Sequence, residues 1–170
     1  GSKQHSRPPM KAETVLITRT EPGASKSAAS AIERGYEAIV SPLARIDYAG
    51  TAPDLAGVDA IAVTSRHGVR ALAALTDDRA LPVFAVGGAT AEAARRNGFA
   101  SVHSADGDAC DLARLIVDKL RPGACILHVR GDIVAGDLAG DLTGRGFAVR
   151  SAAVYRTTPL DTLNAAARKA

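Results

Sequence analysis

A short apolar run that turns abruptly polar limits the folds open to this chain more than any other feature. Residues 60–64 are small or β-branched and show no polar alternation, which is typical of a strand covered on both faces in a parallel sheet. From Ser65 onward the apolar residues recur at helical spacing, so Thr64 and Ser65 lie where a strand becomes a helix. This stretch therefore predicts an α/β protein, in which such turns bind ligands.

The same pattern occurs twice more. Residues 83–86 are apolar, residues 125–129 are apolar except for His128, and each run is followed by a glycine-containing turn. A helix N-terminus presents unpartnered backbone N–H groups and a partial positive charge, so anions bind there. We expect these three turns to line one edge of one sheet, with a fourth turn at Thr18 and Arg19 nearby.

Strands and helices are predicted to alternate along most of the chain. The predicted strands are 14–18, 37–41, 60–64, 83–86, 101–103, 125–129 and 147–155. The predicted helices are about 23–34, 65–75, 89–97, 109–120, a helix from Val134 to near 144–146, and a last one beginning at 160. Residues 43–48 alternate in polarity, which favours a partly exposed ribbon. The repeated β-α order predicts a doubly wound α/β sheet.

The composition indicates how the core is packed and which classes of partner the chain is not built to bind. With 46% hydrophobic but only 4% aromatic residues, the core is expected to be packed mainly by Ala, Val, Leu and Ile. The net charge of +3 is too small, and aromatic residues too few, to indicate nucleic-acid binding. No apolar run approaches the roughly 20 residues needed to span a bilayer.

Several features bear on location and processing. Residues 1–10 are interpreted as a tag or leader, and no secretory signal is evident, so a cytoplasmic protein is expected. Cys110 and Cys125 are then predicted to be reduced core thiols, with a disulfide as the alternative. His67, His103 and His128 are scattered and lack metal-ligand spacing, so no metal site is predicted.

Six short motifs together carry a family resemblance. In order they are 15–19 with Pro22, Pro42 with Leu43, Thr64-Ser65 with Val69, Val86-Gly87 with Thr90, Arg130-Gly131, and 154–157. Their order and spacing resemble those of uroporphyrinogen-III synthases, over residues 15 to about 159. Each motif alone is weak, whereas the ordered set is fairly specific.

The resemblance implies two flavodoxin-like domains with doubly wound parallel sheets, joined by a two-stranded ribbon. Residues 11–43 would be the first part of domain 1, 44–48 a ribbon linker, and 49–153 the whole of domain 2. Residues 154–170 would form the return ribbon and begin the second part of domain 1, leaving that domain incomplete in this chain. The small β-α-β unit at one end and the terminal helix at the other fit this expectation.

The resemblance also implies an activity. Members of the family are hydro-lyases of tetrapyrrole and haem biosynthesis that cyclise hydroxymethylbilane with loss of water and inversion of the last pyrrole ring. It implies a small-molecule substrate, a monomer, and no metal or organic cofactor. Two alternatives stay open, namely a noncatalytic flavodoxin-like ligand-binding module and a regulatory homologue of the synthase.

Candidate substrate-binding residues follow from the many carboxylates of such a substrate. Hydroxyls and backbone N–H groups at the turns would donate to carboxylates, and glycines would let the backbone approach closely. Arginines just beyond strand ends would pair with carboxylates, although solvated arginine is the alternative. The candidates are Thr18, Arg19, Thr64, Ser65, Arg66, Gly87, Gly88, Thr90, Arg130 and Gly131.

Three candidates have competing roles. Ser65 and Thr90 are equally suited to helix capping, and capping and ligand binding can coexist. Tyr155 matches the tyrosine of the family's Val-Tyr-x-Thr segment and is the one candidate catalytic side chain. Its hydroxyl would assist departure of the substrate hydroxyl as an acid or through a water molecule. The alternative is a tyrosine packed at a strand end.

Overall fold

The structure is a computed structural model that describes residues 14–19, 23–34, 37–40, 44–48, 50–134 and 136–160. Contacts divide the chain into two compact units, one made of residues 1–45 and 158–170 and the other of residues 46–157. Within the described residues, every helix is too short or too polar to cross a membrane.

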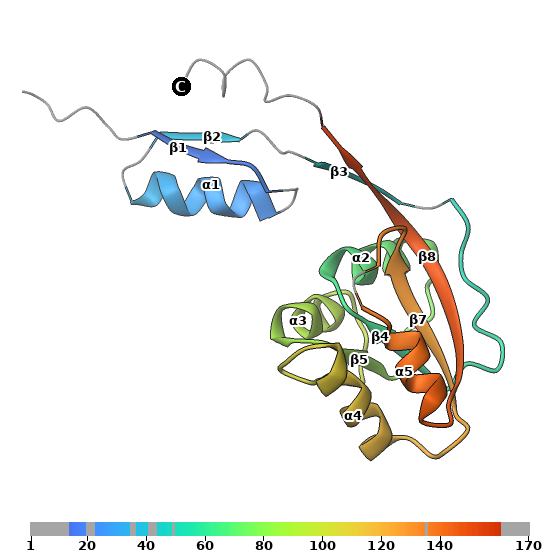
Figure 1. The fold of residues 1–170 in the computed structure, drawn as a ribbon. Helices are drawn as coiled ribbons and strands as arrows, with labels where there is room; N and C mark the ends of the chain where they lie inside the picture. The colour runs from blue at the N-terminus through green and yellow to red at the C-terminus, as the bar shows by residue number, and fades with distance from the viewer. Residues whose placement is uncertain are drawn as a thin grey trace, which may run out of the picture. The chain divides into compact units, whose positions relative to one another are not determined.

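The first unit contains a parallel pair of strands, β1 (Thr14–Ile17) and β2 (Glu37–Val40), connected through helix α1 (Gly23–Glu33) (Figure 1). Ala24 of α1 is fully buried. The guanidinium of Arg19 donates to Ser27 Oγ over 3.2 Å. Thr18 and Arg19 belong to this unit, so their predicted nearness to the other three turns stays a prediction.

The second unit is organised around one sheet with the strand order β3-β8-β7-β4-β5-β6. The strands of the sheet are β3 (Ala44–Tyr48), β4 (Ala60–Val63), β5 (Val83–Ala85), β6 (Val102–Ser104), β7 (Cys125–Gly131) and β8 (Ala148–Pro159), and the second unit includes β3 from residue 46 and β8 up to residue 157. All neighbours from β8 to β6 pair in parallel. The described chain is therefore a mixed α/β fold, as predicted from the β-α alternation.

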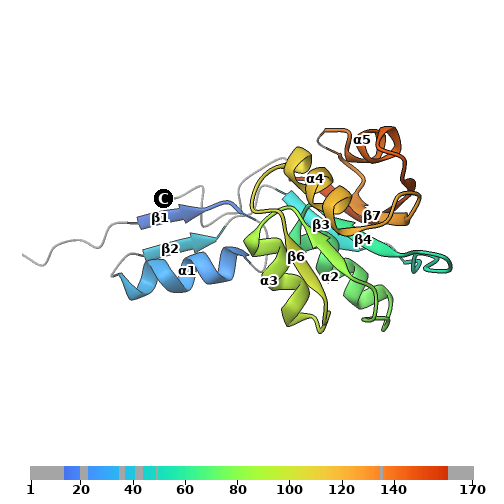
Figure 2. The same ribbon diagram turned by 90° about the horizontal axis from the view of Figure 1, so that it is seen from below.

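Helices cover both faces of this sheet. Figure 2 shows α4 (Ala109–Lys119) and α5 (Leu138–Gly144) on one face, with α2 (Arg66–Leu75) and α3 (Gly88–Arg96) on the other. Each face packs a separate apolar core: Ile61 and Val63 of β4 face α2 and α3, whereas Ala60 and Ala62 face α4 and α5. All four residues are at most 1% exposed. The absence of polar alternation in 60–64 thus correctly predicted a strand buried on two sides.

The connections on either side of the β4–β7 pair run in opposite directions. From β4 the chain passes through α2 to β5, and from β7 it passes through α5 to β8 on the other side. In open α/β sheets the carboxyl ends of two such strands flank a crevice where ligands bind. Because β4, β5 and β7 are parallel in one sheet, the three predicted turns do lie on one edge.

Element boundaries differ from the predictions mainly around β7 and α5. Val134, predicted to begin a helix, is 45% exposed in the loop after β7. Helix α5 begins at Leu138 because the Asp137 carboxylate accepts the Gly140 N–H over 3.0 Å and caps it there. Strand β8 runs to Pro159, past its predicted end. Of the predicted last helix, 161–170 lie outside the described residues.

The two cysteines are free, as predicted, but the prediction of core thiols is wrong for Cys110, which is exposed. Cys110 is the second residue of α4, where the apolar residues Leu112, Ala113 and Ile116 form the buried side. Cys125 opens β7 and is partly buried.

Candidate functional site

A cavity of about 330 Å³ opens where the β4 and β7 carboxyl ends flank the crevice. Its polar lining is formed by Thr64 and Ser65 after β4, His128 and Arg130 of β7, and Tyr155 of β8. Val86, Ile133, Val134 and Leu138 supply an apolar part of the wall. A cavity of this size, with few convergent polar groups on an apolar wall, is typical of a small-molecule site. We call it the crevice cavity.

Ser65 joins the start of α2 to Tyr155. Ser65 Oγ accepts the Gly68 N–H over 3.1 Å and lies 2.9 Å from the Tyr155 hydroxyl oxygen. In this second bond either hydroxyl can donate. The two hydroxyls carry two protons and this bond uses one of them, so the other hydroxyl proton of the Ser65–Tyr155 pair is left for a ligand. Helix capping by Ser65 is thus confirmed, and it leaves a binding role open.

A β-bulge places Tyr155 on the Ser65 side of the sheet. The β7–β8 register passes from Arg130 opposite Ala153 to Gly131 opposite Tyr155, so Val154 is an extra residue. Val154 and Tyr155 both contact the core beneath α2 and α3. In a regular strand, consecutive side chains would point to opposite faces. Without the bulge Tyr155 would face α4 and α5, away from Ser65.

Gly131 makes room for the Tyr155 ring. A Cβ atom on Gly131 would lie 2.6 Å from two ring carbons of Tyr155, well inside van der Waals contact. The sequence predicted that Gly131 lets a ligand approach the backbone closely. In the structure the Tyr155 ring makes this close approach. The Arg130 guanidinium donates to the Gly131 carbonyl over 2.9 Å, so Arg130 is partly tied down rather than fully solvated.

Asp132 fixes the strand end that carries Tyr155. Its backbone N–H donates to the Tyr155 carbonyl over 3.0 Å, and its Oδ1 accepts the Thr157 N–H over 3.0 Å. Its Oδ2 lies 4.0 Å from Nε of Arg156. Asp132 was not among the residues predicted from the sequence. Its position directly after Arg130 and Gly131 at a strand end was the available signal.

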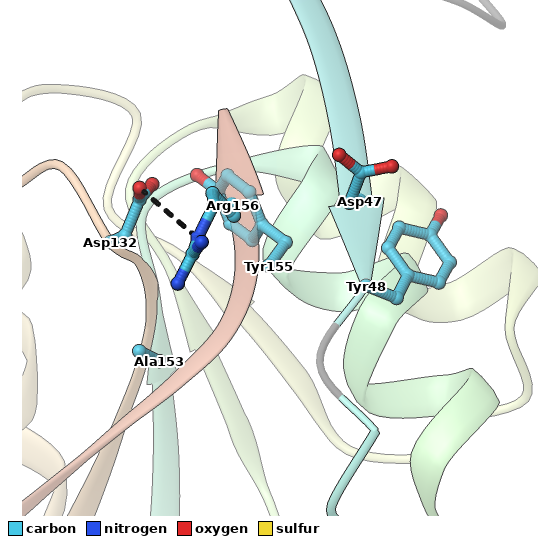
Figure 3. Close-up of a pocket in the computed structure, with 6 residues that line it drawn as sticks. All are labelled: Asp47, Tyr48, Asp132, Ala153, Tyr155 and Arg156. Atoms are coloured by element: carbon cyan, nitrogen blue, oxygen red, sulfur yellow. Dashed lines mark ion pairs between the residues drawn. The ribbon is translucent and has the colours of Figure 1, made fainter. Parts of the chain in front are cut away.

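A second cavity of about 330 Å³ shares Tyr155 with the first. Figure 3 shows its lining, with Asp132 and Arg156 forming the ion pair and Asp47 and Tyr48 contributed by β3. Tyr155 therefore lies between two recesses of the same unit. Asp47, Tyr48 and Arg156 were not predicted, because the ribbon implied for 44–48 and the return segment did not indicate which of its side chains line a recess.

Two imidazoles near the site are shifted toward the neutral form. Burial, and then the positive charge of Arg130, lower the pKa of His128. Burial, followed by Arg70 and Arg66, lowers the pKa of His67, whose ring centroid lies 5.8 Å from that of Tyr155. At neutral pH the positive charge at the crevice cavity therefore comes from arginine and not from histidine.

Five of the predicted site residues meet at the crevice cavity: Thr64, Ser65, Arg130, Gly131 and Tyr155. Among the described residues, its lining does not include Arg66, Gly87, Gly88 or Thr90. Gly87 is the N-cap of α3, and Thr90, in its first turn, is only 6% exposed. Thr90 is therefore not the cap that the sequence allowed.

No group of three or more potential His, Cys, Asp or Glu metal ligands gathers in the part of the chain that the structure describes. Arg130 is the sole ionised side chain in the described lining of the crevice cavity. An arginine beside hydroxyl groups favours an anionic ligand such as a carboxylate.

The chain was compared with models of protein families and with curated protein sequences. A family described as HEM4, uroporphyrinogen-III synthase HemD, matches residues 25–170. No curated protein sequence matches the chain.

Two similar solved structures agree in fold. A mutant uroporphyrinogen III synthase from Thermus thermophilus is 20% identical with a TM-score of 0.58, over 88% of this chain and 64% of that one. A uroporphyrinogen-III synthetase from Helicobacter pylori is 18% identical with a TM-score of 0.62, over 94% of this chain and 67% of that one. The chain thus spans less than two thirds of the length of the Thermus thermophilus protein.

Proposed function

Because the chain belongs to the HEM4 family of uroporphyrinogen-III synthases, we propose that it forms part of a hydro-lyase that cyclises hydroxymethylbilane. The proposed reaction removes water and inverts the last pyrrole ring to give uroporphyrinogen III. Family membership covers residues 25–170, which include every polar residue of the crevice cavity.

The observation that carries the proposal is the Ser65–Tyr155 hydroxyl pair, 2.9 Å apart, in a cavity whose described lining holds Arg130 and no carboxylate. A substrate with several acetate and propionate arms suits such a lining, since arginine and hydroxyl groups bind carboxylates. Thr64 and Ser65 would bind substrate arms beside Arg130.

Tyr155 is the proposed acid. Its hydroxyl, or a water molecule that it holds, would protonate the departing substrate hydroxyl, which leaves as water. The pyrrole N–H of the first ring then gives up its proton, which restores the acid and leaves an electrophilic azafulvene. Attack by the substituted carbon of the last ring gives a spiro intermediate, which fragments and recloses with that ring reversed. Ring closure without inversion occurs unaided, so the main task of the protein is to impose one conformer on the substrate.

The remaining predicted contacts extend this proposal. Arg66, Gly87, Gly88 and Thr90 would act at the rim of the same sheet edge, and Thr18 and Arg19 would contribute from the first unit. The two-domain, flavodoxin-like arrangement belongs to the proposal as well. So do a cytoplasmic location, a monomeric state and cofactor-free catalysis.

The test is to supply the purified full-length protein with freshly prepared hydroxymethylbilane and to separate the uroporphyrin isomers after oxidation. Isomer III in excess over the spontaneous isomer I is expected. Isomer I alone would overturn the proposal and favour a noncatalytic or regulatory homologue.

A further inference from the structure

His128 is a buried polar side chain without a partner. It lies in the middle of β7, is 2% exposed, and its Nε2 atom has no hydrogen bond although it is shielded from bulk solvent. An unsatisfied polar atom of this kind costs free energy of folding, and native proteins seldom leave one without a reason. The residues that line the crevice cavity include His128.

The surroundings of His128 favour an anionic ligand group. Arg130 follows two residues later on β7, so both side chains lie on the same face of the sheet. No described residue that lines the crevice cavity carries a negative charge. A neighbouring recess of about 300 Å³ also contains His128 and Arg130, but there Asp137 adds a carboxylate. An acidic group is therefore accommodated on the crevice side.

The protonation state fits a donor role. Since burial and Arg130 lower the pKa of His128, the ring is neutral near pH 7 and carries one N–H. A neutral imidazole donates a hydrogen bond without adding a second buried cation beside Arg130. The pair thus offers one charged donor group and one neutral donor to an incoming acceptor.

We propose that His128 and Arg130 together form a subsite for one carboxylate arm of the tetrapyrrole substrate, with the ring N–H of His128 as a donor. The inference rests on the proposed function and adds to it a binding residue in the interior of a strand. Thr64, Ser65 and Tyr155 then hold other parts of the same substrate at the mouth of the cavity.

The experiment compares His128→Leu and His128→Gln with the wild-type full-length protein, using hydroxymethylbilane as substrate. Loss of a hydrogen bond to a charged group predicts a KM about 10-fold to 100-fold higher for His128→Leu, with a smaller change in kcat. His128→Gln, which keeps an N–H donor, is expected to recover part of this loss. His103→Leu is the matched control, because His103 stacks on Phe84 from β6, at a centroid distance of 4.9 Å.

Two further measurements separate binding from folding. His128→Leu removes the orphaned atom, so its thermal unfolding temperature should equal or exceed that of the wild type while its KM rises. In protein carrying ¹⁵N-labelled histidine, uroporphyrinogen III should shift the side-chain resonances of His128 and leave those of His103 in place.

The possible failures are distinguishable. If the wild-type protein makes no excess of isomer III, the proposed function fails and this inference fails with it. If the wild type makes isomer III but His128→Leu keeps its KM within a factor of two and the His128 resonances do not move, the subsite alone is refuted.

Discussion

The Tyr155 hydroxyl lies 2.9 Å from Ser65 Oγ, although 90 residues separate these two side chains in the sequence. The contact links the last described strand of the chain to the first turn of α2. Ser65 also caps that helix through the Gly68 N–H. One serine therefore stabilises a helix start and orients the candidate catalytic hydroxyl.

Removing the tyrosine hydroxyl should slow the reaction without abolishing it. General acid catalysis by a positioned side chain contributes about 10²-fold or more, so Tyr155→Phe should lower kcat by about that factor. The ring and its packing on the core remain, so the unfolding free energy should change by about 1 kcal/mol or less. Tyr48→Phe, at a residue 46% exposed in β3, is the control. A Tyr155→Phe enzyme with full kcat would leave Tyr155 a structural residue.

Ser65→Ala should affect stability and activity together. Loss of an N-cap costs about 1 kcal/mol, and the same change removes the hydrogen-bond partner of Tyr155. Ser65→Thr keeps both oxygen contacts and should restore stability and kcat. Glu92→Gly, at an exposed position in α3, costs a similar free energy without touching the cavity. Equal kcat for Ser65→Ala and Glu92→Gly would argue against a positioning role for Ser65.

Gly131→Ala should displace the Tyr155 ring. The new Cβ would lie 2.6 Å from ring carbons, so the ring or the strand must move, at a cost of about 1–3 kcal/mol. We expect kcat to fall at least as far as in Tyr155→Phe. Gly144→Ala is the matched control, because a Cβ on Gly144 meets no atom within 4 Å. Urea unfolding and steady-state kinetics on both variants measure the two effects.

Gly88→Ala tests whether the backbone at Gly88 contacts the substrate, because the substitution should affect KM without lowering stability. A Cβ on Gly88 also meets nothing within 4 Å, so alanine at this first residue of α3 should leave stability unchanged or raise it by about 0.5–1 kcal/mol. If the backbone there binds a substrate carboxylate, the methyl group will hinder its approach and KM will rise. An unchanged KM would remove Gly88 from the substrate-binding set.

Stability should decrease as the pH falls through the weakly acidic range. His128 and His67 have pKa values lowered by burial in the folded state, whereas in the unfolded chain they titrate near 6.5. The unfolded state therefore binds more protons below that pH, and folding loses free energy. Unfolding free energies from urea titrations at several pH values should show a weaker dependence for His128→Leu than for the wild type. If the two proteins showed the same pH dependence, His128 would not contribute to the loss of stability at low pH.

The order and type of the elements were largely predictable from local pattern. Residues 60–63 include no polar residue, and the strand that they form is buried on both faces. The start of α5 was missed because Val134 continues the helical spacing of Leu138 and Leu142. The Asp137 cap, which stops the helix short of Val134, competes with that pattern.

The site was predictable only where it depends on strand ends. Thr64, Ser65, Arg130 and Gly131 follow or close buried strands, and parallel pairing brings strand ends together. His128 was not selected because its burial, its missing partner and its cavity are properties of the folded chain. Tyr155 was selected from a family resemblance, whereas the bulge that turns it toward Ser65 leaves no pattern in the sequence.

The bulge at Val154 has a consequence for which contacts hold Tyr155 in place. Tyr155 is held opposite Gly131 by contacts downstream of the extra residue, including those of Asp132 with Tyr155 and Thr157. A chain lacking Val154 would close the ladder regularly and still present its tyrosine opposite the same glycine. The place of Tyr155 is therefore set from Thr157 backward, through the contacts of Asp132, and not by its count forward along β8.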